Sequence, residues 1–168
     1  MNEFSREELE AIIKSLSWND GYGCYTRAGF EKTIWPQIAD KARWIIFFDI
    51  DDMHTLNAQH GYAGVNELIK KSLEVRGSDF MAGQWFSGDE FIVCITDDDP
   101  KRDASNPIDF CVRLSEVFRS NGVPATFVIA PIQSNDLFAI VAPAQAACQE
   151  VKANFQRGTI SILPGDPR

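Results

Sequence analysis

The sequence predicts an α/β domain in which helices cover a mixed β-sheet. Segments with helical periodicity alternate with short apolar runs, the pattern typical of a sheet packed against helices. The run R-W-I-I-F-F-D-I-D at 43–51 is continuously apolar from Trp44 to Phe48, so it predicts a central strand buried on both faces. The chain has 168 residues, the size of one ordinary domain, and neither a repeat nor a linker divides it.

Helical patterns flank the predicted central strand in the first half of the chain. Ser5 and Glu8 form a capping-box pattern at the start of the first helix. Pro36 interrupts or closes the second helix, because proline disfavours helical backbone in the residue before it. The predicted helical segments are residues 5–16, 27–41, 52–58 and 64–74.

The second half of the chain begins with a predicted β-hairpin, whose strands are joined by the turn S-G-D-E at 87–90. A polar loop follows at 97–107. The predicted strands of this half are 79–86, 90–96, 124–130 and 159–163, and the predicted helices are 108–120 and 135–156. We therefore expect an N-terminal helix over 1–18, a single domain over 19–163 and a loose tail over 164–168.

Composition argues against several classes of protein. The formal net charge of −8 disfavours nucleic-acid binding, which needs a basic surface to displace counterions, but it allows a small phosphate ligand held through a metal ion. No apolar run approaches the ~20 residues that span a bilayer, and the chain does not start like a signal peptide. We expect a cytoplasmic protein without membrane contact. The cysteines form no C-x-x-C pair and are expected to be reduced thiols: Cys24, Cys94, Cys111 and Cys148.

Two acidic motifs stand out, and each has an ordinary structural explanation. Asp49 and Asp51 end the central strand and point to the same side of it, because side chains alternate along a strand. Alone, they fit strand-end acids that face water, or, for Asp51 and Asp52, the start of a helix whose dipole favours acids. The S-G-D-E stretch alone fits a hairpin tip, where Gly and Asp suit the turn geometry.

The two motifs are more informative together. One strand ends in acids, and the neighbouring hairpin carries Asp89 and Glu90. Carboxylates that converge on one point repel each other unless a cation neutralises them. Hard oxygen ligands suit Mg²⁺ or Mn²⁺ with bound phosphates, the arrangement of metal-assisted phosphoryl transfer. The combination predicts a metal and phosphate site at this end of the sheet.

Four stretches, taken in order, resemble the GGDEF family, the diguanylate cyclases. N-D-G-Y-G-C-Y-T-R-A-G-F at 19–30 is similar to the family's D-x-L-T-G-L-x-N-R-R-x-F, and D-I-D-D-M-H-T-L-N at 49–57 to D-x-D-x-F-K-x-I-N. G-Y-A-G-V-N-E-L at 61–68 is similar to G-H-x-x-G-D-x-L, and S-G-D-E-F at 87–91 to the family signature, with Ser for the first Gly. The resemblance covers nearly the whole chain. It implies a palm-like fold with a mixed central sheet of about five strands and helices on both faces.

The resemblance implies a reaction. Two nucleoside triphosphates, with GTP as the first choice, condense to a cyclic dinucleotide and two pyrophosphates for second-messenger signalling. Each domain binds one triphosphate, so catalysis implies a homodimer, which can be transient. By family position, Asp49, Asp89 and the Ile50 carbonyl ligate Mg²⁺ or Mn²⁺, two ions per site. Glu90 ligates metal or helps to deprotonate the 3′-hydroxyl, and Gly88 lets the hairpin backbone approach the nucleotide.

The resemblance also implies a nucleotide-binding set. By family position Asn57 and Asn66 face the base, and Met53 and His54 stand where the family has Phe and Lys. The residue at position 66 is normally Asp, whose carboxylate accepts both N–H donors of guanine. The Asn66 amide offers one acceptor and one donor group, which can match adenine instead. We therefore expect a relaxed or altered base preference.

Two further motifs concern phosphate and product. V-K-A-N-F-Q-R-G at 151–158 resembles the family's A-K-x-x-G-R-N, so Lys152 and the displaced Arg157 are expected to bind phosphate. The alternative is that both cations stabilise the C-terminal end of a helix. R-G-S-D matches the R-x-x-D of the family's product-inhibition site, although it lies farther from the signature than usual. Arg76 and Asp79 are therefore candidate inhibitory residues.

Three function classes remain open at the level of sequence. The intact Asp49, Asp89 and Glu90 favour an active cyclase. Several departures from the family pattern favour instead a degenerate domain that binds nucleotide or cyclic dinucleotide and acts as a regulatory module. These departures are His54, Val65, Asn66 and Trp85. The third class is a structural domain with incidental acids. A separate sensor or effector protein is a further candidate partner.

Overall fold

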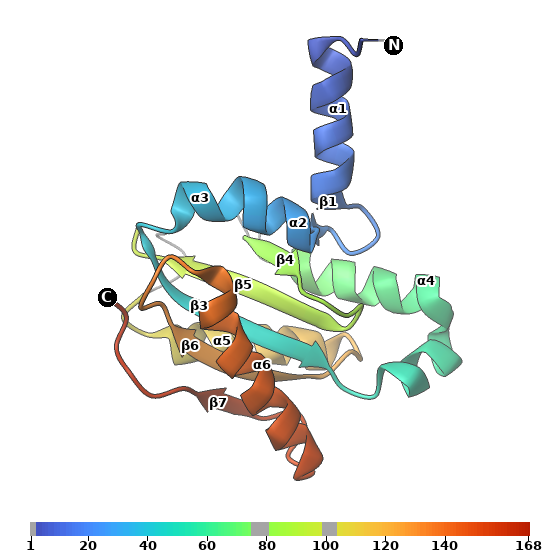
Figure 1. Ribbon diagram of the computed structural model, residues 1–168. Helices are drawn as coiled ribbons and strands as arrows, with labels where there is room; N and C mark the ends of the chain where they lie inside the picture. The colour runs from blue at the N-terminus through green and yellow to red at the C-terminus, as the bar shows by residue number, and fades with distance from the viewer. Residues whose placement is uncertain (1–2, 75–80, 99–103) are drawn as a thin grey trace.

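The computed structural model describes residues 3–74, 81–98 and 104–168. A seven-stranded sheet forms its centre, in the order β1-β2-β4-β5-β3-β6-β7, with helices on both faces (Figure 1). The strands are β1 (Trp18–Asn19), β2 (Cys24–Tyr25), β3 (Ala42–Ile50), β4 (Ala82–Gln84), β5 (Glu90–Thr96), β6 (Ala125–Pro131) and β7 (Ile160–Ile162). The helices are α1 (Arg6–Ser17), α2 (Arg27–Gly29), the π-helix η1 (Phe30–Ile34), α3 (Trp35–Ile38), α4 (Met53–Glu74), α5 (Pro107–Ser120) and α6 (Leu137–Ala153).

The predicted mixed α+β fold is confirmed, and the central strand is the one that the sequence predicts. β3 pairs antiparallel with β5 on one side and with β6 on the other. The sheet is mixed because β2 pairs parallel with β4, and β7 pairs parallel with β6. The sheet has more strands than the five expected because β1 and β2 add a two-residue pair, which is too short to show a pattern in the sequence.

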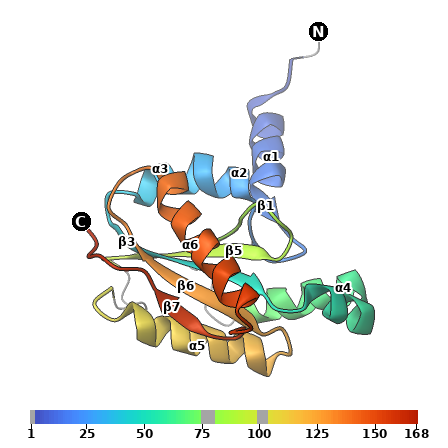
Figure 2. The same cartoon turned by 60° about the horizontal axis from the view of Figure 1, so that its bottom comes forward.

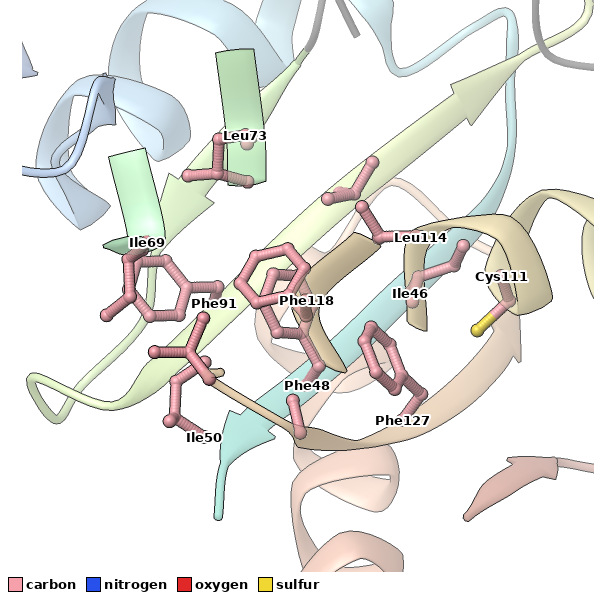
Figure 3. Packing of buried hydrophobic residues seen from close by; sticks show 14 of the residues in the cluster. Ile46, Phe48, Ile50, Ile69, Leu73, Phe91, Cys111, Leu114, Phe118 and Phe127 are labelled. Atoms are coloured by element: carbon pink, nitrogen blue, oxygen red, sulfur yellow. The ribbon is translucent and has the colours of Figure 1, made fainter. Parts of the chain in front are cut away.

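Alternation along β3 divides the core into two layers. Phe48 and Ile50 pack toward α4 and α5, together with residues of β5 and β6 (Figure 3). Ile45 and Phe47 pack toward α3 and α6 on the other face. Figure 2 shows α5 and α6 on opposite sides of the sheet. Asp49 follows Phe47 by two positions, so its side chain belongs to the α6 face.

Helix α1 stands apart from this core. The predicted capping box is present: the Ser5 side chain accepts from the Glu8 N–H, and the Glu8 carboxylate accepts from the Ser5 N–H. The helix buries no residue and projects from the body of the domain (Figure 1). Its apolar side chains are exposed, namely Leu9, Ile12, Ile13 and Leu16. Across the described residues, no helix is both long and apolar enough to cross a membrane.

Two helical regions differ in detail from the patterns in the sequence. Residues 27–38 continue through Pro36, because the π-helix precedes it and places the proline in the first turn of α3, where an N–H is not needed. The predicted segments 52–58 and 64–74 follow one another along α4. Gly61 separates them with a non-helical backbone (φ 72°, ψ 161°), a conformation open almost only to glycine.

The C-terminal residues 164–168, which the sequence predicts to be loose, are tied to the domain by hydrogen bonds. The Arg168 backbone N–H donates to the Ile132 carbonyl at 3.0 Å, and the Gln133 side chain donates to the Asp166 carbonyl at 3.0 Å. These are contacts of backbone groups and polar tips, which leave no apolar pattern in the sequence. The four cysteines are buried and form no disulfide with one another, as expected for reduced thiols.

Candidate active site

The acids of the two motifs meet where β3 ends and β5 begins. Asp49 lies directly opposite Glu90 in the antiparallel register of these strands. The Ile50 N–H donates to the Asp89 carbonyl at 2.9 Å, which fixes the hairpin against the end of β3. The pairing is the physical reason that residues forty positions apart in the sequence share one site, since antiparallel register places strand end beside strand start.

A lysine from α6 lies among these acids. The Lys152 Nζ is 3.0 Å from Asp49 Oδ1 and 3.1 Å from Asp51 Oδ1, and it donates to the Ile50 carbonyl oxygen at 3.1 Å. The lysine side chain is 18% exposed, so the contact is partly shielded from water. Burial alone would lower the pKa of Lys152, but Asp49 and Asp51 outweigh it and raise the pKa above its ordinary value. The ammonium is therefore charged at neutral pH.

Asp49 has the most perturbed carboxyl group of the site. Burial raises its pKa to about 7; the Lys152 ammonium opposes this shift, and nearby Asp89 adds to it. Asp89 is half-buried at the hairpin tip, where its Oδ1 accepts a hydrogen bond from the Ser87 hydroxyl at 2.5 Å. Two neighbouring carboxylates repel each other when both are charged, so they favour a shared proton or a bound cation.

The other two acids on the α6 face are held by polar partners. Glu90 is buried, and the Gln145 side-chain amide donates to its two carboxylate oxygens at 3.1 and 3.0 Å. Asp51 is buried as well and accepts from the Thr126 hydroxyl at 2.7 Å. These bonds fix the orientation of both carboxylates before any ligand binds.

The hairpin tip is anchored by Tyr22, which lies in the turn between β1 and β2. The Tyr22 hydroxyl donates to the Gly88 carbonyl at 3.1 Å, and its ring packs edge-on against Phe91 with centroids 5.3 Å apart. A Cβ added at Gly88 would meet nothing closer than the Tyr22 hydroxyl at 3.8 Å. The packing of the protein therefore leaves room for a methyl group at Gly88.

Comparison with known proteins identifies the fold. No family model matches the chain, and no curated protein matches it. Among solved structures, the coiled coil and GGDEF domain of DgcB from Caulobacter crescentus, in complex with c-di-GMP, superposes with a TM-score of 0.72 at 15% identity, covering 94% of this chain and 91% of that one. The active GGEEF domain of a diguanylate cyclase from Vibrio cholerae gives a TM-score of 0.56 at 18% identity, covering 76% and 86%.

The chain has the GGDEF fold. A third structure with this fold is the diguanylate cyclase SiaD from Pseudomonas aeruginosa in complex with its activator SiaC, with a TM-score of 0.64 at 14% identity, covering 94% of this chain and 66% of that one. The resemblance that the motifs indicate therefore extends to the three-dimensional architecture.

Within this GGDEF fold, the predicted base-facing residues lie on α4, on either side of the Gly61 break. Asn57 and Asn66 are half-buried, and within the described part of the chain neither side-chain amide makes a hydrogen bond. Met53 is partly buried against the core, and His54 is exposed. The structure thus leaves both amides available to a ligand, while His54 faces solvent.

Both predicted phosphate cations contact acids of the D-I-D-D motif. Lys152 contacts Asp49 and Asp51, and Arg157 forms an ion pair with the exposed Asp52, a residue with positive φ (52°). The alternative expectation was that both cations only stabilise the C-terminal end of a helix. Their ion pairs with these acids show that they do more than that. The candidate inhibitory residues Arg76 and Asp79 lie outside the described residues.

Two departures from the family pattern are core residues in this GGDEF fold. Val65 is fully buried against the sheet, and Trp85 is 4% exposed. Trp85 packs against Phe86 and Phe138, with ring centroids 5.3 and 5.2 Å away. Its indole N–H has no hydrogen-bond partner among the described residues. A charged side chain at position 85 would therefore need a different arrangement of these aromatic residues.

Three residues that orient the site are not among those predicted from the sequence: Tyr22, Thr126 and Gln145. Thr126 was the most visible, because it is the one hydroxyl in the apolar stretch A-T-F-V-I-A-P. Gln145 lies seven residues before Lys152, and that spacing puts both on the same face of a helix. Tyr22 had no such signal, since its partner is a backbone carbonyl of a distant turn.

The donors of this site suit a hard divalent cation. Asp49, Asp89 and the Ile50 carbonyl can supply oxygen ligands. The Lys152 ammonium contacts two of these donors, Asp49 and the Ile50 carbonyl, together with Asp51. Within residues 3–74, 81–98 and 104–168, no three acids, histidines or cysteines are yet grouped closely enough to hold a metal. The oxygen donors therefore suit a divalent ion, and in this structure the Lys152 ammonium contacts two of them.

Proposed function

We propose that the chain is a nucleotidyltransferase of the diguanylate cyclase type. It condenses two nucleoside triphosphates to a cyclic dinucleotide and releases two pyrophosphates. The observation that supports this most strongly is the convergence of Asp49, Asp89 and Glu90 at one end of the β3–β5 pair in a GGDEF fold. GTP is the first-choice substrate, since the similar DgcB structure holds c-di-GMP.

In this proposal Asp49, Asp89 and the Ile50 carbonyl hold Mg²⁺ or Mn²⁺, two ions per site. Such an ion, when bound, screens the charge on the phosphate oxygens and lowers the pKa of the attacking hydroxyl. The half-buried position of Asp89 and the raised pKa of Asp49 suit this role, because a cation favours their charged forms.

The chain's own residues orient the reaction. Glu90, held by Gln145, accepts the proton that the 3′-hydroxyl loses as its oxygen attacks the α-phosphorus. The new P–O bond forms while the bond from the α-phosphorus to the bridging oxygen breaks, and pyrophosphate leaves with that electron pair. A second, identical attack closes the ring. Tyr22 keeps the hairpin, and therefore Asp89, in place during both steps.

The proposed reaction needs two copies of the site, because each triphosphate supplies both an attacking hydroxyl and an electrophilic phosphorus. We propose a homodimer that forms at least transiently during the reaction. The exposed apolar face of α1 is one surface that supports such pairing. A separate sensor or effector protein is a further proposed partner, by analogy with SiaD and its activator. Cysteines without disulfides and a triphosphate substrate fit a cytoplasmic location.

A regulatory module is the second candidate function. The observation that favours it is the Lys152 ammonium, which neutralises Asp49 and Asp51 without any metal. In this alternative the acids stabilise the fold, and the surface around the hairpin tip binds a nucleotide or cyclic dinucleotide without turnover.

One experiment separates the two functions. Purified protein is incubated with Mg²⁺ or Mn²⁺ and each of the four ribonucleoside triphosphates, alone and in pairs, and the products are identified by mass. An active cyclase gives a cyclic dinucleotide that Asp89→Ala abolishes, with Asp109→Ala, a change of an exposed side chain on α5, as the control. Nucleotide binding without product under every condition would instead identify the regulatory module.

A further inference from the structure

Lys152 makes a contact that a phosphate-binding lysine would not need. Its Nζ lies 3.0 Å from Asp49 Oδ1 and 3.1 Å from Asp51 Oδ1, and it donates to the Ile50 carbonyl at 3.1 Å. The oxygens belong to three consecutive residues at the end of β3. They include the Asp49 carboxylate and the Ile50 carbonyl, the same donors that the proposed metal site uses. An ammonium and a divalent ion cannot share these oxygens at contact distance, because the two cations repel each other.

We propose that Lys152 is an exchangeable resident cation: its ammonium closes the Asp49–Ile50 donor set in the metal-free protein and must leave before a divalent ion binds there. The inference rests on the proposed metal site and adds a competitor within the same chain. It predicts that metal affinity is set partly by a residue that is not a ligand.

The surroundings of the acids explain why the lysine leaves only in exchange for another cation. The side chains of Asp49 and Asp51 are 14% and 5% exposed, and a shielded carboxylate that loses its partner is strongly destabilised. Asp51 retains the Thr126 hydroxyl bond at 2.7 Å when the lysine departs. Asp49 Oδ1 is buried and, within the described residues, accepts no well-directed hydrogen bond. Asp49 is therefore the acid that most needs a replacement cation.

The position of Lys152 makes departure feasible. It lies in the last turn of α6, one residue before the helix ends at Ala153. A lysine side chain has a flexible four-carbon stem, so its ammonium can swing to a new partner without a backbone movement. A triphosphate beside the metal would offer such a partner. Metal binding would thus release the lysine for phosphate, which reconciles its carboxylate contacts with the predicted phosphate role.

The first test measures Mn²⁺ binding in the absence of nucleotide, from the electron paramagnetic resonance signal of free Mn²⁺. Lys152→Met keeps the apolar stem and removes the competing charge, so we expect Mn²⁺ to bind about tenfold more tightly than to wild type. Arg157→Gln is the matched control, because it removes one positive charge from the neighbouring Asp52 without freeing the donor set. Equal or weaker binding by Lys152→Met, or an equal gain in Arg157→Gln, would overturn the proposal.

The second test uses wild-type protein and does not depend on the folding of a variant. Lysines are acetylated by a limiting amount of acetic anhydride with and without Mn²⁺, and each site is quantified by peptide mass spectrometry. We expect Mn²⁺ to increase the modification of Lys152, since the amine leaves its acids, and to leave the exposed Lys41 unchanged. Unchanged or reduced modification of Lys152 would contradict the exchange.

These readouts separate the inference from the proposed catalysis. Tighter Mn²⁺ binding by Lys152→Met in a protein that makes no cyclic dinucleotide supports the exchange and refutes only the cyclase activity. Product formation together with unchanged Mn²⁺ affinity in Lys152→Met refutes only the exchange.

Discussion

Among single residues, Asp49 shows most clearly how burial and neighbouring charge set the chemistry of this site. Its pKa is raised from 3.8 to about 7 by burial, with Lys152 opposing the shift and Asp89 adding to it. The residue is therefore partly protonated at neutral pH in the metal-free protein. A bound cation would remove that proton, so ligand and proton compete for the same carboxylate.

This raised pKa predicts a pH dependence of stability. Between pH 3.8 and about 7 the folded protein holds a proton on Asp49 that the unfolded chain has lost. The contribution of this group to the free energy of unfolding is therefore full below pH 3.8 and is lost as the pH rises through about 7. Urea unfolding of wild type and Asp49→Asn, both with a chelator, should show wild type losing stability relative to the variant across this window. A constant difference between the two would contradict the assignment.

Asn66 predicts the base preference. Its half-buried amide offers one acceptor and one donor group, whereas a carboxylate would accept both donors of guanine. We expect Asn66→Asp to raise the preference for GTP over ATP, in binding or turnover, by on the order of ten- to hundred-fold, corresponding to ~1–3 kcal/mol. Competition between the two triphosphates in one reaction measures this ratio. Exclusive use of GTP by wild type, with no change in the variant, would show that Asn66 does not select the base.

The candidate site was predictable from the sequence where residue type and position coincide. Asp49, Asp89 and Glu90 are acids at the ends of strands, and strand pairing then brings them together. The partners Gln145 and Thr126 were not predictable, because their contacts depend on how α6 lies across the sheet and on the register of β6. The contact of Lys152 with Asp49 and Asp51 was not predictable for the same reason: a cation on a helix has many potential partners that the sequence alone does not distinguish.

Among the structural elements, the β4–β5 hairpin combines a rigid base with an open tip. A Cβ at Gly83 in β4 would lie 2.9 Å from the Phe30 Cβ, whereas one at Gly88 would meet nothing within 3.4 Å and the Tyr22 hydroxyl at 3.8 Å. The first glycine is therefore required by the packing of the protein. The second is not required by packing, and the proposed approach of a nucleotide to this turn would account for it.

The two glycines provide a matched pair of variants. We expect Gly83→Ala to lower the free energy of unfolding by ~1–3 kcal/mol, because the added methyl overpacks the core. Gly88→Ala should leave the free energy of unfolding almost unchanged and weaken triphosphate binding, since the methyl occupies ligand space. Urea unfolding and equilibrium binding of a non-hydrolysable triphosphate measure both effects. Unweakened binding in a folded Gly88→Ala would show that the nucleotide does not approach this turn.

Elements with a repeated apolar pattern were predictable, and irregular ones were not. The five longer strands follow from apolar runs, and β3 follows from its length and burial. The π-helix before Pro36 and the two-residue strands β1 and β2 depend on local backbone hydrogen bonds, which no side-chain period reports. The C-terminal segment 164–168 was equally unpredictable, because hydrogen bonds of backbone and polar groups hold it to the domain.

For the whole molecule, α1 predicts self-association. It buries no residue and exposes Leu9 and Leu16, 47% and 68% exposed, seven positions apart on one helix face. We expect the double variant Leu9→Ser and Leu16→Ser to dimerise more weakly than wild type in sedimentation equilibrium. The free energy of unfolding of the domain should not change, because neither side chain packs on the core. Wild type that stays monomeric at all concentrations, with and without nucleotide, would contradict this prediction.

The most direct measurement of the central proposal is the stoichiometry of the reaction. Wild-type protein is incubated with Mg²⁺ or Mn²⁺ and GTP, and cyclic dinucleotide and pyrophosphate are quantified together, with Asp89→Ala in parallel. The proposed mechanism predicts two pyrophosphates for each cyclic dinucleotide and neither product from Asp89→Ala. Release of inorganic phosphate without dinucleotide, or no turnover of any triphosphate by wild type, would contradict it.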